Sequence, residues 1–159
     1  MKFITKNIFF LFPILLAVSC SSDDSIVKDE VKPTISINYN EGFPQACVEL
    51  VKGETYNFKA KVTDNIALAS YSLDIHHNFD HHTHDDQGAQ CNFDSKKQAI
   101  NPLIFMENYR IEKGLTTYEI NIRQTIPDDI DTGDYHFQYS VTDETGWQSR
   151  TSVDVKIIE

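Results

Sequence analysis

The chain has 159 residues, of which 40% are hydrophobic, and a formal net charge of −10 from 14 Lys and Arg against 24 Asp and Glu. This composition is ordinary for a globular protein and argues against a wholly disordered or collagen-like chain. At this length we expect one domain. The acidic balance argues against a nucleic-acid binder, because phosphate backbones attract faces rich in Lys and Arg.

Residues 1–19 have the pattern of a secretory signal peptide. Lys2 and Lys6 precede an apolar run, Ile8–Val18, that is too short to span a bilayer. The run ends in Leu16–Cys20, and small residues just before a Cys resemble the lipobox of bacterial lipoproteins. That resemblance implies cleavage before Cys20, whose thiol would receive a lipid and anchor the chain to a membrane. The alternative is a plain signal peptide with an incidental Cys.

Residues 20–32 are polar, and we interpret them as a flexible, acidic tether that follows the lipidated Cys. The stretch Ser21–Ser25 contains two Asp and resembles the surface-export signal of Bacteroidota lipoproteins. The resemblance implies a lipid-anchored protein on the outer face of the outer membrane, at the cell surface. The periplasmic face of that membrane is the alternative.

Residues 33–159 alternate between apolar and polar side chains, with β-branched and aromatic residues in the apolar positions. Tyr56, Phe58 and Ala60, for example, alternate with polar neighbours. A period of two predicts half-buried strands. We therefore expect an all-β fold, a single immunoglobulin-like antiparallel β-sandwich of about seven strands. The expected strands cover residues 33–39, 54–64, 69–77, about 103–112, 115–124, 133–142 and 147–158.

Three short motifs strengthen this interpretation. Val62–Leu68 and Val141–Trp147 resemble the strand ends of bacterial immunoglobulin-like domains, and Asp131–Tyr135 resembles the tyrosine corner of such folds. Together with the lipobox and a His-rich loop, the chain resembles an uncharacterised family of Bacteroidota surface lipoproteins. That resemblance implies a fold and a location, but no activity.

A cluster of histidines is the chemically most informative feature. Five of the six His lie within nine residues, at the start of the long connection between strands 69–77 and 103–112. They are His76, His77, His81, His82 and His84. Neutral imidazoles together with carboxylates are ligands for Zn²⁺ and Cu²⁺. Asp74 and Asp80 lie in the same stretch and are candidate ligands or orienting partners of the imidazoles.

Strand alternation predicts that the sixth histidine, His136, joins this cluster. If Leu73 and Ile75 point into the core, His76 points outward, and the same alternation directs His136 outward from its own strand. In an immunoglobulin-like sandwich these two strands are antiparallel neighbours. We therefore expect His76 and His136 to lie together on one exposed face. One or two of His81, His82 and His84 would complete the site.

The other two cysteines, Cys47 and Cys91, have two possible roles. In an exported protein a disulfide between them is favoured, and it would attach the far side of the His-rich loop to the domain. The alternative is that a thiolate serves as a ligand for a softer metal.

No catalytic motif is recognisable, so we do not expect an enzyme. Among the possible functions, a metal-dependent enzyme is the one that the sequence favours least. We expect a lipoprotein that binds a transition metal, Zn²⁺ or Cu²⁺, for capture, buffering or delivery to an outer-membrane transporter. The alternative is an interaction module, either an adhesin or an accessory subunit of a glycan- or nutrient-uptake complex. In that case the His-rich loop would be a contact surface. The strand order places the tether and the loop at opposite ends of the domain.

Overall fold

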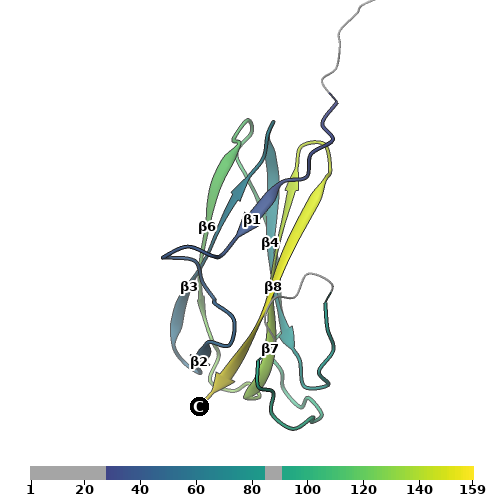
Figure 1. The fold of residues 1–159 in the computed structure, drawn as a ribbon. Helices are drawn as coiled ribbons and strands as arrows, with labels where there is room; N and C mark the ends of the chain where they lie inside the picture. Colours follow the sequence, from purple (N-terminus) through teal and green to yellow (C-terminus); the bar gives the residue numbers. More distant parts are fainter. Residues whose placement is uncertain (1–27, 85–90) are drawn as a thin grey trace, which may run out of the picture.

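Two β-sheets pack face to face in the computed structural model, which describes residues 28–84 and 91–159 (Figure 1). All regular elements within these ranges are strands, and none of the described segments is a helix long and apolar enough to cross a membrane. Residues 1–27, with Cys20, lie outside the description. The strands are β1 (Thr34–Ser36), β2 (Glu49–Val51), β3 (Thr55–Thr63), β4 (Leu68–His77), β5 (Phe105–Arg110), β6 (Thr117–Thr125), β7 (Gly133–Asp143) and β8 (Gln148–Ile158).

The smaller sheet has the order β1-β3-β6, and the larger has the order β2-β8-β7-β4-β5. The predicted all-β sandwich is therefore confirmed, and one strand pairing departs from the antiparallel pattern. Strand β2 was not predicted, and it runs parallel to β8, with Leu50 opposite Ile157. Three residues are too few for an alternating pattern to be recognised.

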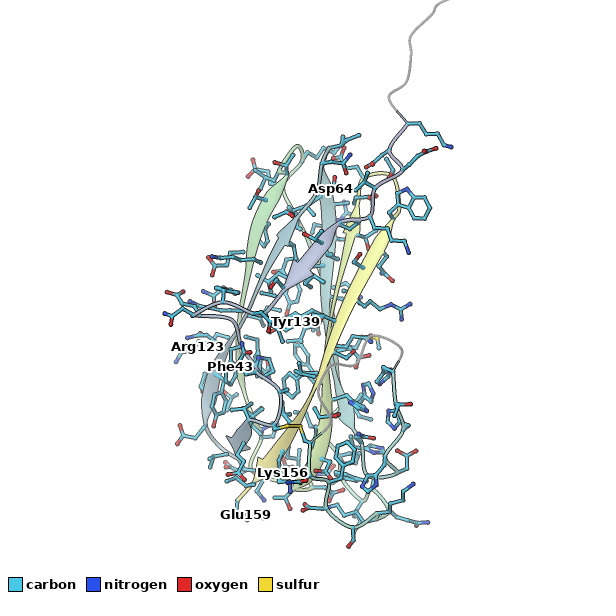
Figure 2. The ribbon with its side chains drawn as sticks, in the orientation of Figure 1. Phe43, Asp64, Arg123, Tyr139, Lys156 and Glu159 are labelled. Atoms are coloured by element: carbon cyan, nitrogen blue, oxygen red, sulfur yellow. A yellow bond between two sulfur atoms is a disulfide. The ribbon has the colours of Figure 1, made fainter. Side chains whose placement is uncertain are left out.

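The core lies between the two sheets and follows from the alternation. Phe58, Ala60 and Val62 of β3 are fully buried, as are Leu73 and Ile75 of β4. An aromatic pair joins the sheets, because the rings of Phe58 and Phe137 stack with centroids 5.0 Å apart. Figure 2 shows side chains, Tyr139 among them, in the space between the two layers.

Strand β7 is buried on both faces, whereas alternation along the sequence predicted a half-buried strand. Its inward residues pack in the core, and its outward polar residues His136, Gln138 and Ser140 are buried as well. Gln138 donates a hydrogen bond to the hydroxyl of Ser152 on the neighbouring strand (3.0 Å). The outer face of the larger sheet is thus partly covered, and the cover over His136 is the His-rich loop.

The tyrosine corner is confirmed. The hydroxyl of Tyr135 donates to the backbone oxygen of Asp131 (2.6 Å) and accepts from the backbone N–H of Leu103 (3.2 Å). Burial raises the pKa of Tyr135 to about 12. These bonds fasten the start of β7 to the end of the long connection, so the strand that carries His136 begins at a fixed place.

The N-terminal segment and the His-rich loop lie at opposite ends of the domain, as predicted (Figure 1). The register pairs Leu68 with Asp143 at one end of β4 and His77 with Tyr135 at the other. The N-terminal segment reaches the first end, where the indole N–H of Trp147 donates to the backbone oxygen of Asp29 (3.1 Å). Asp29 falls within the predicted tether, yet it is buried against the domain.

Candidate metal site

The site begins where β4 ends and β7 starts. His76 and His136 are register partners in these two strands, and their ring centroids lie 5.4 Å apart. Alternation along the strands therefore predicted this pair correctly. The expectation of an exposed face was wrong for His136, which is fully buried. It is buried because the chain after β4 folds back over it.

The fold-back is set by a tight turn after β4. The backbone N–H of Asn78 donates to the oxygen of Asp134 (2.8 Å), and that of His81 donates to the oxygen of Asn78 (3.1 Å). His81 adopts a φ of 60°, a left-handed conformation that is uncommon outside glycine. This reversal brings the two following histidines, His82 and His84, back over β4 and β7.

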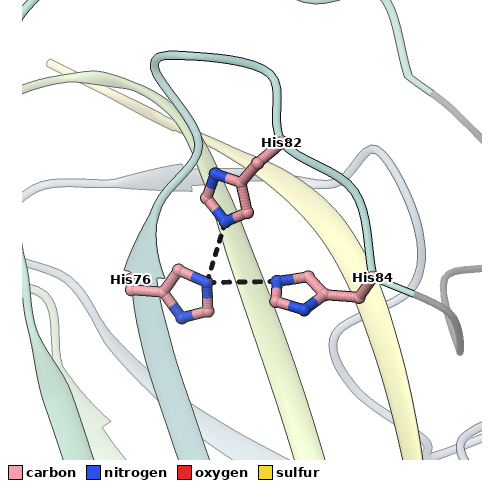
Figure 3. A group of neighbouring side chains, drawn as sticks. All are labelled: His76, His82 and His84. Carbon is pink, nitrogen blue, oxygen red and sulfur yellow. Dashed lines mark hydrogen bonds between the residues drawn. The ribbon is translucent and has the colours of Figure 1, made fainter.

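Three imidazole nitrogens converge at this point (Figure 3). Nε2 of His76 lies 3.2 Å from Nε2 of His82 and 3.2 Å from Nε2 of His84. The three side chains are partly exposed, and their nitrogens form a group whose spacing suits a metal ion. The loop thus supplies two of these nitrogens, and strand β4 supplies the third.

Carboxylates orient two of the three rings. Asp74 accepts a hydrogen bond from Nδ1 of His76 (3.0 Å), and Asp80 accepts one from Nδ1 of His82 (2.7 Å). The hydrogen bond from His82 also lowers the pKa of Asp80. An ionised carboxylate only accepts, so each Nδ1 carries the hydrogen, and Nε2 of the neutral ring directs a lone pair to the shared centre. Where one Nε2 of a pair carries a hydrogen, the contact is a hydrogen bond, and a cation bound among the three nitrogens would replace that hydrogen.

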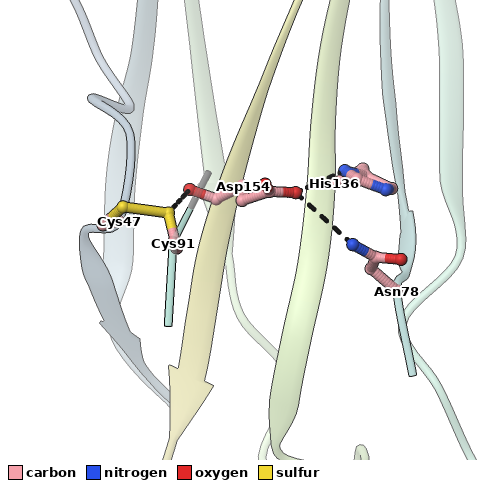
Figure 4. The surroundings of a disulfide bond; sticks show 5 residues. All are labelled: Cys47, Asn78, Cys91, His136 and Asp154. Atoms are coloured by element: carbon pink, nitrogen blue, oxygen red, sulfur yellow. Dashed lines mark hydrogen bonds and ion pairs between the residues drawn. A yellow bond between two sulfur atoms is a disulfide. The ribbon is translucent and has the colours of Figure 1, made fainter. Parts of the chain in front are cut away.

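His136 lies under the His-rich loop and forms contacts that hold the loop in place. Its Nδ1 lies 2.7 Å from Oδ1 of Asp154, and its Nε2 donates to the backbone oxygen of His82 (3.1 Å). The amide of Asn78 lies 3.5 Å from the same Asp154 oxygen (Figure 4). The His136 ring packs 4.6 Å from that of His84. In this arrangement its nitrogens hold the loop rather than face the group of three.

The remaining two predicted ligands lie elsewhere. His77 stacks on Phe79, with ring centroids 4.9 Å apart, and His81 stacks on Phe93 at 4.8 Å. Nε2 of His81 lies 3.9 Å from Oδ2 of Asp134, a carboxyl whose pKa is raised by burial. Alternation already set His77 apart from His76, its neighbour in β4, but the sequence could not separate His81 from His82 and His84, because the turn at His81 determines which rings face β4.

The predicted disulfide between Cys47 and Cys91 is confirmed, and it excludes the thiolate alternative because the two sulfurs are bonded to each other. The backbone N–H of Cys47 donates to the oxygen of Asp154 (2.8 Å), and Sγ of Cys91 lies 3.6 Å from the same oxygen (Figure 4). The disulfide therefore lies against the residue whose side chain holds His136.

Asp154 is the residue of the site that the sequence analysis missed. It is almost fully buried, and the register places it directly opposite His136. The sequence did contain a signal for Asp154, because alternation along β8 directs this residue outward, on the same face of the sheet as His136. An acidic residue in an outward position of a strand is usually solvated, so its type alone does not indicate a structural partner.

Two of the three nitrogen–nitrogen distances can be compared with those around a tetrahedral zinc ion. Zinc binds imidazole nitrogen at about 2.0–2.1 Å, so two ligands of a tetrahedral ion are about 3.3–3.4 Å apart. The two distances of 3.2 Å from His76 are close to this edge. Three nitrogens would leave one position of a four-coordinate ion for water or for a ligand from elsewhere.

Comparison with known proteins identifies the family of this chain but assigns no activity to it. A family profile described as "Domain of unknown function (DUF4625)" matches residues 18–158. The chain belongs to the DUF4625 family. The DUF4625 match takes in every strand, the disulfide and the histidine group. No curated protein matches this DUF4625 chain. Among solved structures it is similar to Spo0M, a sporulation control protein from Bacillus subtilis, with 9% identity and a TM-score of 0.39 over 80% of this chain; the chain spans 49% of that protein.

Proposed function

We propose that this protein binds a transition metal ion, Zn²⁺ or Cu²⁺, through His76, His82 and His84. The observation that carries the proposal is the convergence of three Nε2 atoms, two of them oriented by carboxylates on the far side of the ring. A carboxylate that accepts from the distal nitrogen is the usual partner of a metal-bound histidine, because it fixes the tautomer and makes the ligand more basic. The role we assign is capture, buffering or delivery of the ion.

The donor set favours a borderline cation over Mg²⁺ or Ca²⁺, which prefer oxygen. Between the two candidate ions, Cu²⁺ binds more tightly to almost any nitrogen site, so affinity alone does not identify the native metal. The spacing of 3.2 Å favours Zn²⁺, because a tetrahedral ion fits it and adjacent ligands of a square-planar ion would be closer together.

We further propose that the protein is anchored through lipidated Cys20 to the outer face of a bacterial outer membrane. The support for this is the lipobox-like sequence before Cys20 and the acidic stretch after it. Because the N-terminal segment and the histidine group lie at opposite ends of the domain, the group would then face away from the membrane. That position suits capture of the ion from the surroundings, and delivery to an outer-membrane transporter is the later step that we propose.

The test is a competition titration of the purified full chain, in detergent and stripped of metal, with Zn²⁺, Cu²⁺ and Ni²⁺. His76→Ala should weaken Zn²⁺ binding by about 100-fold or more, because it removes the nitrogen that both loop histidines face. His77→Ala is the matched control, since it changes the adjacent histidine, which packs on Phe79 outside the group. That control should bind Zn²⁺ as the wild type does.

Two results would contradict the proposal. One is binding weaker than about 100 μM for all three ions, which corresponds to less than about 5.5 kcal/mol of binding free energy. The other is equal loss of affinity in His76→Ala and His77→Ala, which would mean that the loop binds ions without a defined site.

A second candidate function, a non-enzymatic interaction module, is favoured by one observation. Ile104 and Met106, on or just before edge strand β5, are 72% and 65% exposed, and Met106 is the register partner of Asp74. Apolar side chains beside an unpaired sheet edge are suited to contact with another protein. If the titration shows no metal binding, this surface together with the His-rich loop becomes the better-supported site.

A further inference from the structure

A second group of ligand-type side chains lies at the opposite end of the sandwich. Asp29 precedes β1, Asp64 follows β3, and Asp143 ends β7. One carboxylate oxygen from each lies within 4.8 Å of the other two. These residues are far apart in sequence, and the fold brings them together where the β3–β4 and β7–β8 turns meet the N-terminal segment.

Each carboxylate is held by hydrogen bonds to one of its two oxygens only. Oδ1 of Asp64 accepts from the backbone N–H groups of Ile66 and Ala67. Oδ1 of Asp143 and Oδ1 of Asp29 are held in the same way by neighbouring donors. Those donors are the backbone N–H groups of Thr145 and Trp147 with the Thr145 hydroxyl for Asp143, and the backbone N–H of Val31 with the Asn65 amide for Asp29.

The other oxygen, Oδ2, is buried in all three residues and has no hydrogen-bond partner in the described parts of the chain. Asp29 and Asp143 are only 6% and 2% exposed, so water does not solvate these atoms as it does at a surface. Within residues 28–84 and 91–159, no Lys, Arg or His forms an ion pair within 4.0 Å with any of the three. Buried carboxylate oxygens without hydrogen-bond partners are strongly unfavourable, and like charges placed together make them more so.

We propose that Asp29, Asp64 and Asp143 bind Ca²⁺. Three carboxylate oxygens form a hard donor set, with neither nitrogen nor sulfur to favour Zn²⁺ or Cu²⁺. Ca²⁺ accepts six to eight oxygens in flexible geometry, so backbone carbonyls and water can complete its coordination. Mg²⁺ requires a near-ideal octahedron and gives up its water reluctantly, which suits a site assembled from two turns and the N-terminal segment less well.

The consequence concerns the N-terminal segment. Asp29 belongs to the chain that leads into β1, whereas Asp64 and Asp143 belong to turns of the sandwich. A Ca²⁺ ion shared by all three would fasten this segment to the domain and set the direction in which the preceding chain leaves it. This proposal is independent of the histidine group and stands whether or not that group binds a metal.

The chain contains a built-in reporter, because Trp147 is its only tryptophan and its indole N–H donates to the backbone of Asp29. The test is a titration of the metal-stripped full chain with CaCl₂, followed by Trp147 fluorescence and by thermal unfolding. We expect a saturable change in emission and a rise in Tm of about 5–10 °C when Ca²⁺ is in about 100-fold excess over Kd. MgCl₂ at the same concentration should give a clearly smaller rise.

Asp143→Asn is the decisive variant, because its amide oxygen can still accept from Thr145 and Trp147 while Oδ2 is replaced by an uncharged NH₂. Without Ca²⁺ its Tm should equal or exceed that of the wild type, since one buried charge is gone, and Ca²⁺ should no longer raise it. Asp131→Asn is the matched control: Asp131 also accepts two backbone N–H groups, those of Ile100 and Asn101, but lies at the other end. Its response to Ca²⁺ should be that of the wild type.

Three results would overturn the proposal. The first is no change in emission or Tm with CaCl₂ up to about 10 mM, which is roughly ten times the Kd of the weakest protein calcium sites. The second is an undiminished rise in Asp143→Asn, and the third is a rise with Mg²⁺ as large as that with Ca²⁺. Failure here leaves Zn²⁺ binding at the histidine group unaffected, so the two proposals are tested separately.

Discussion

The two ends of this sandwich place similar side chains in different surroundings. At the histidine end, nitrogens form the centre of the group and carboxylates lie behind them, accepting from Nδ1. At the aspartate end, carboxylate oxygens form the centre and backbone N–H groups lie behind them, donating to Oδ1. In both groups hydrogen bonds on the outer side hold the side chains, for two of the three histidines and for all three aspartates, and one ligand-type atom from each residue lies within 4.8 Å of the other two.

The difference lies in how each end is constructed. The histidine group joins one strand end to a loop that folds back beside it, and a disulfide holds the far side of that loop. The aspartate group joins two short turns and the N-terminal segment without a covalent bond between them. The histidine group therefore depends on one long connection, whereas the aspartate group depends on two turns at strand ends and on the N-terminal segment.

The largest effect should come from removing the disulfide with the double variant Cys47→Ser and Cys91→Ser. The bond closes a loop with a sequence separation of 44 residues, for which chain entropy predicts a loss of about 4 kcal/mol in the free energy of unfolding. Urea unfolding measures this loss. Zn²⁺ affinity should fall as well, because the loop is no longer held to the domain, while the Ca²⁺-dependent rise in Tm should remain. If the Ca²⁺-dependent rise in Tm disappeared while Zn²⁺ affinity stayed unchanged, the disulfide would support the aspartate group rather than the histidine group. That result would contradict the comparison.

A smaller effect should follow from Asp74→Asn, which retains the shape of the side chain but removes its charge. The amide is a weaker acceptor for Nδ1 of His76, so Zn²⁺ affinity should fall by about 10- to 100-fold with little change in Tm. Asp128→Asn serves as a control for the loss of one negative charge away from the group. Equal affinities in both variants and the wild type would show that Asp74 does not orient the ring.

The smallest effect should be coupling between the two ends. Strand β4 spans the distance between them with 10 residues, which is about 30 Å, several times the Debye length of about 8 Å at physiological ionic strength. We therefore expect Zn²⁺ affinity measured with saturating Ca²⁺ to agree within about twofold with that measured without it. A tenfold change would mean that the sandwich transmits a conformational change between its ends.

Alternation along the strands made much of this structure predictable. It placed His76 beside His136, and the turn residues around Asp64 and Asp143 marked the ends of strands. It could not choose among the loop histidines, since that choice depends on a left-handed turn at His81, where no glycine signals it.

Burial was the other property that sequence patterns did not reveal. His136 and Asp154 alternate like surface residues, yet the folded-back loop covers them. Asp29 lies in a polar stretch typical of a tether, and its burial depends on contacts with Asn65 and Trp147, which lie 36 and 118 residues away. Contacts between such distant segments leave no periodic signal in the sequence.

The central claim is that His76, His82 and His84 share one metal ion, and X-ray absorption at the zinc edge of the Zn²⁺-loaded full chain tests it most directly. We predict one equivalent of zinc surrounded by three imidazole nitrogens at about 2.0–2.1 Å, with one of these imidazoles lost in His76→Ala. A zinc environment made only of oxygen, or one that is identical in His76→Ala, would contradict the account.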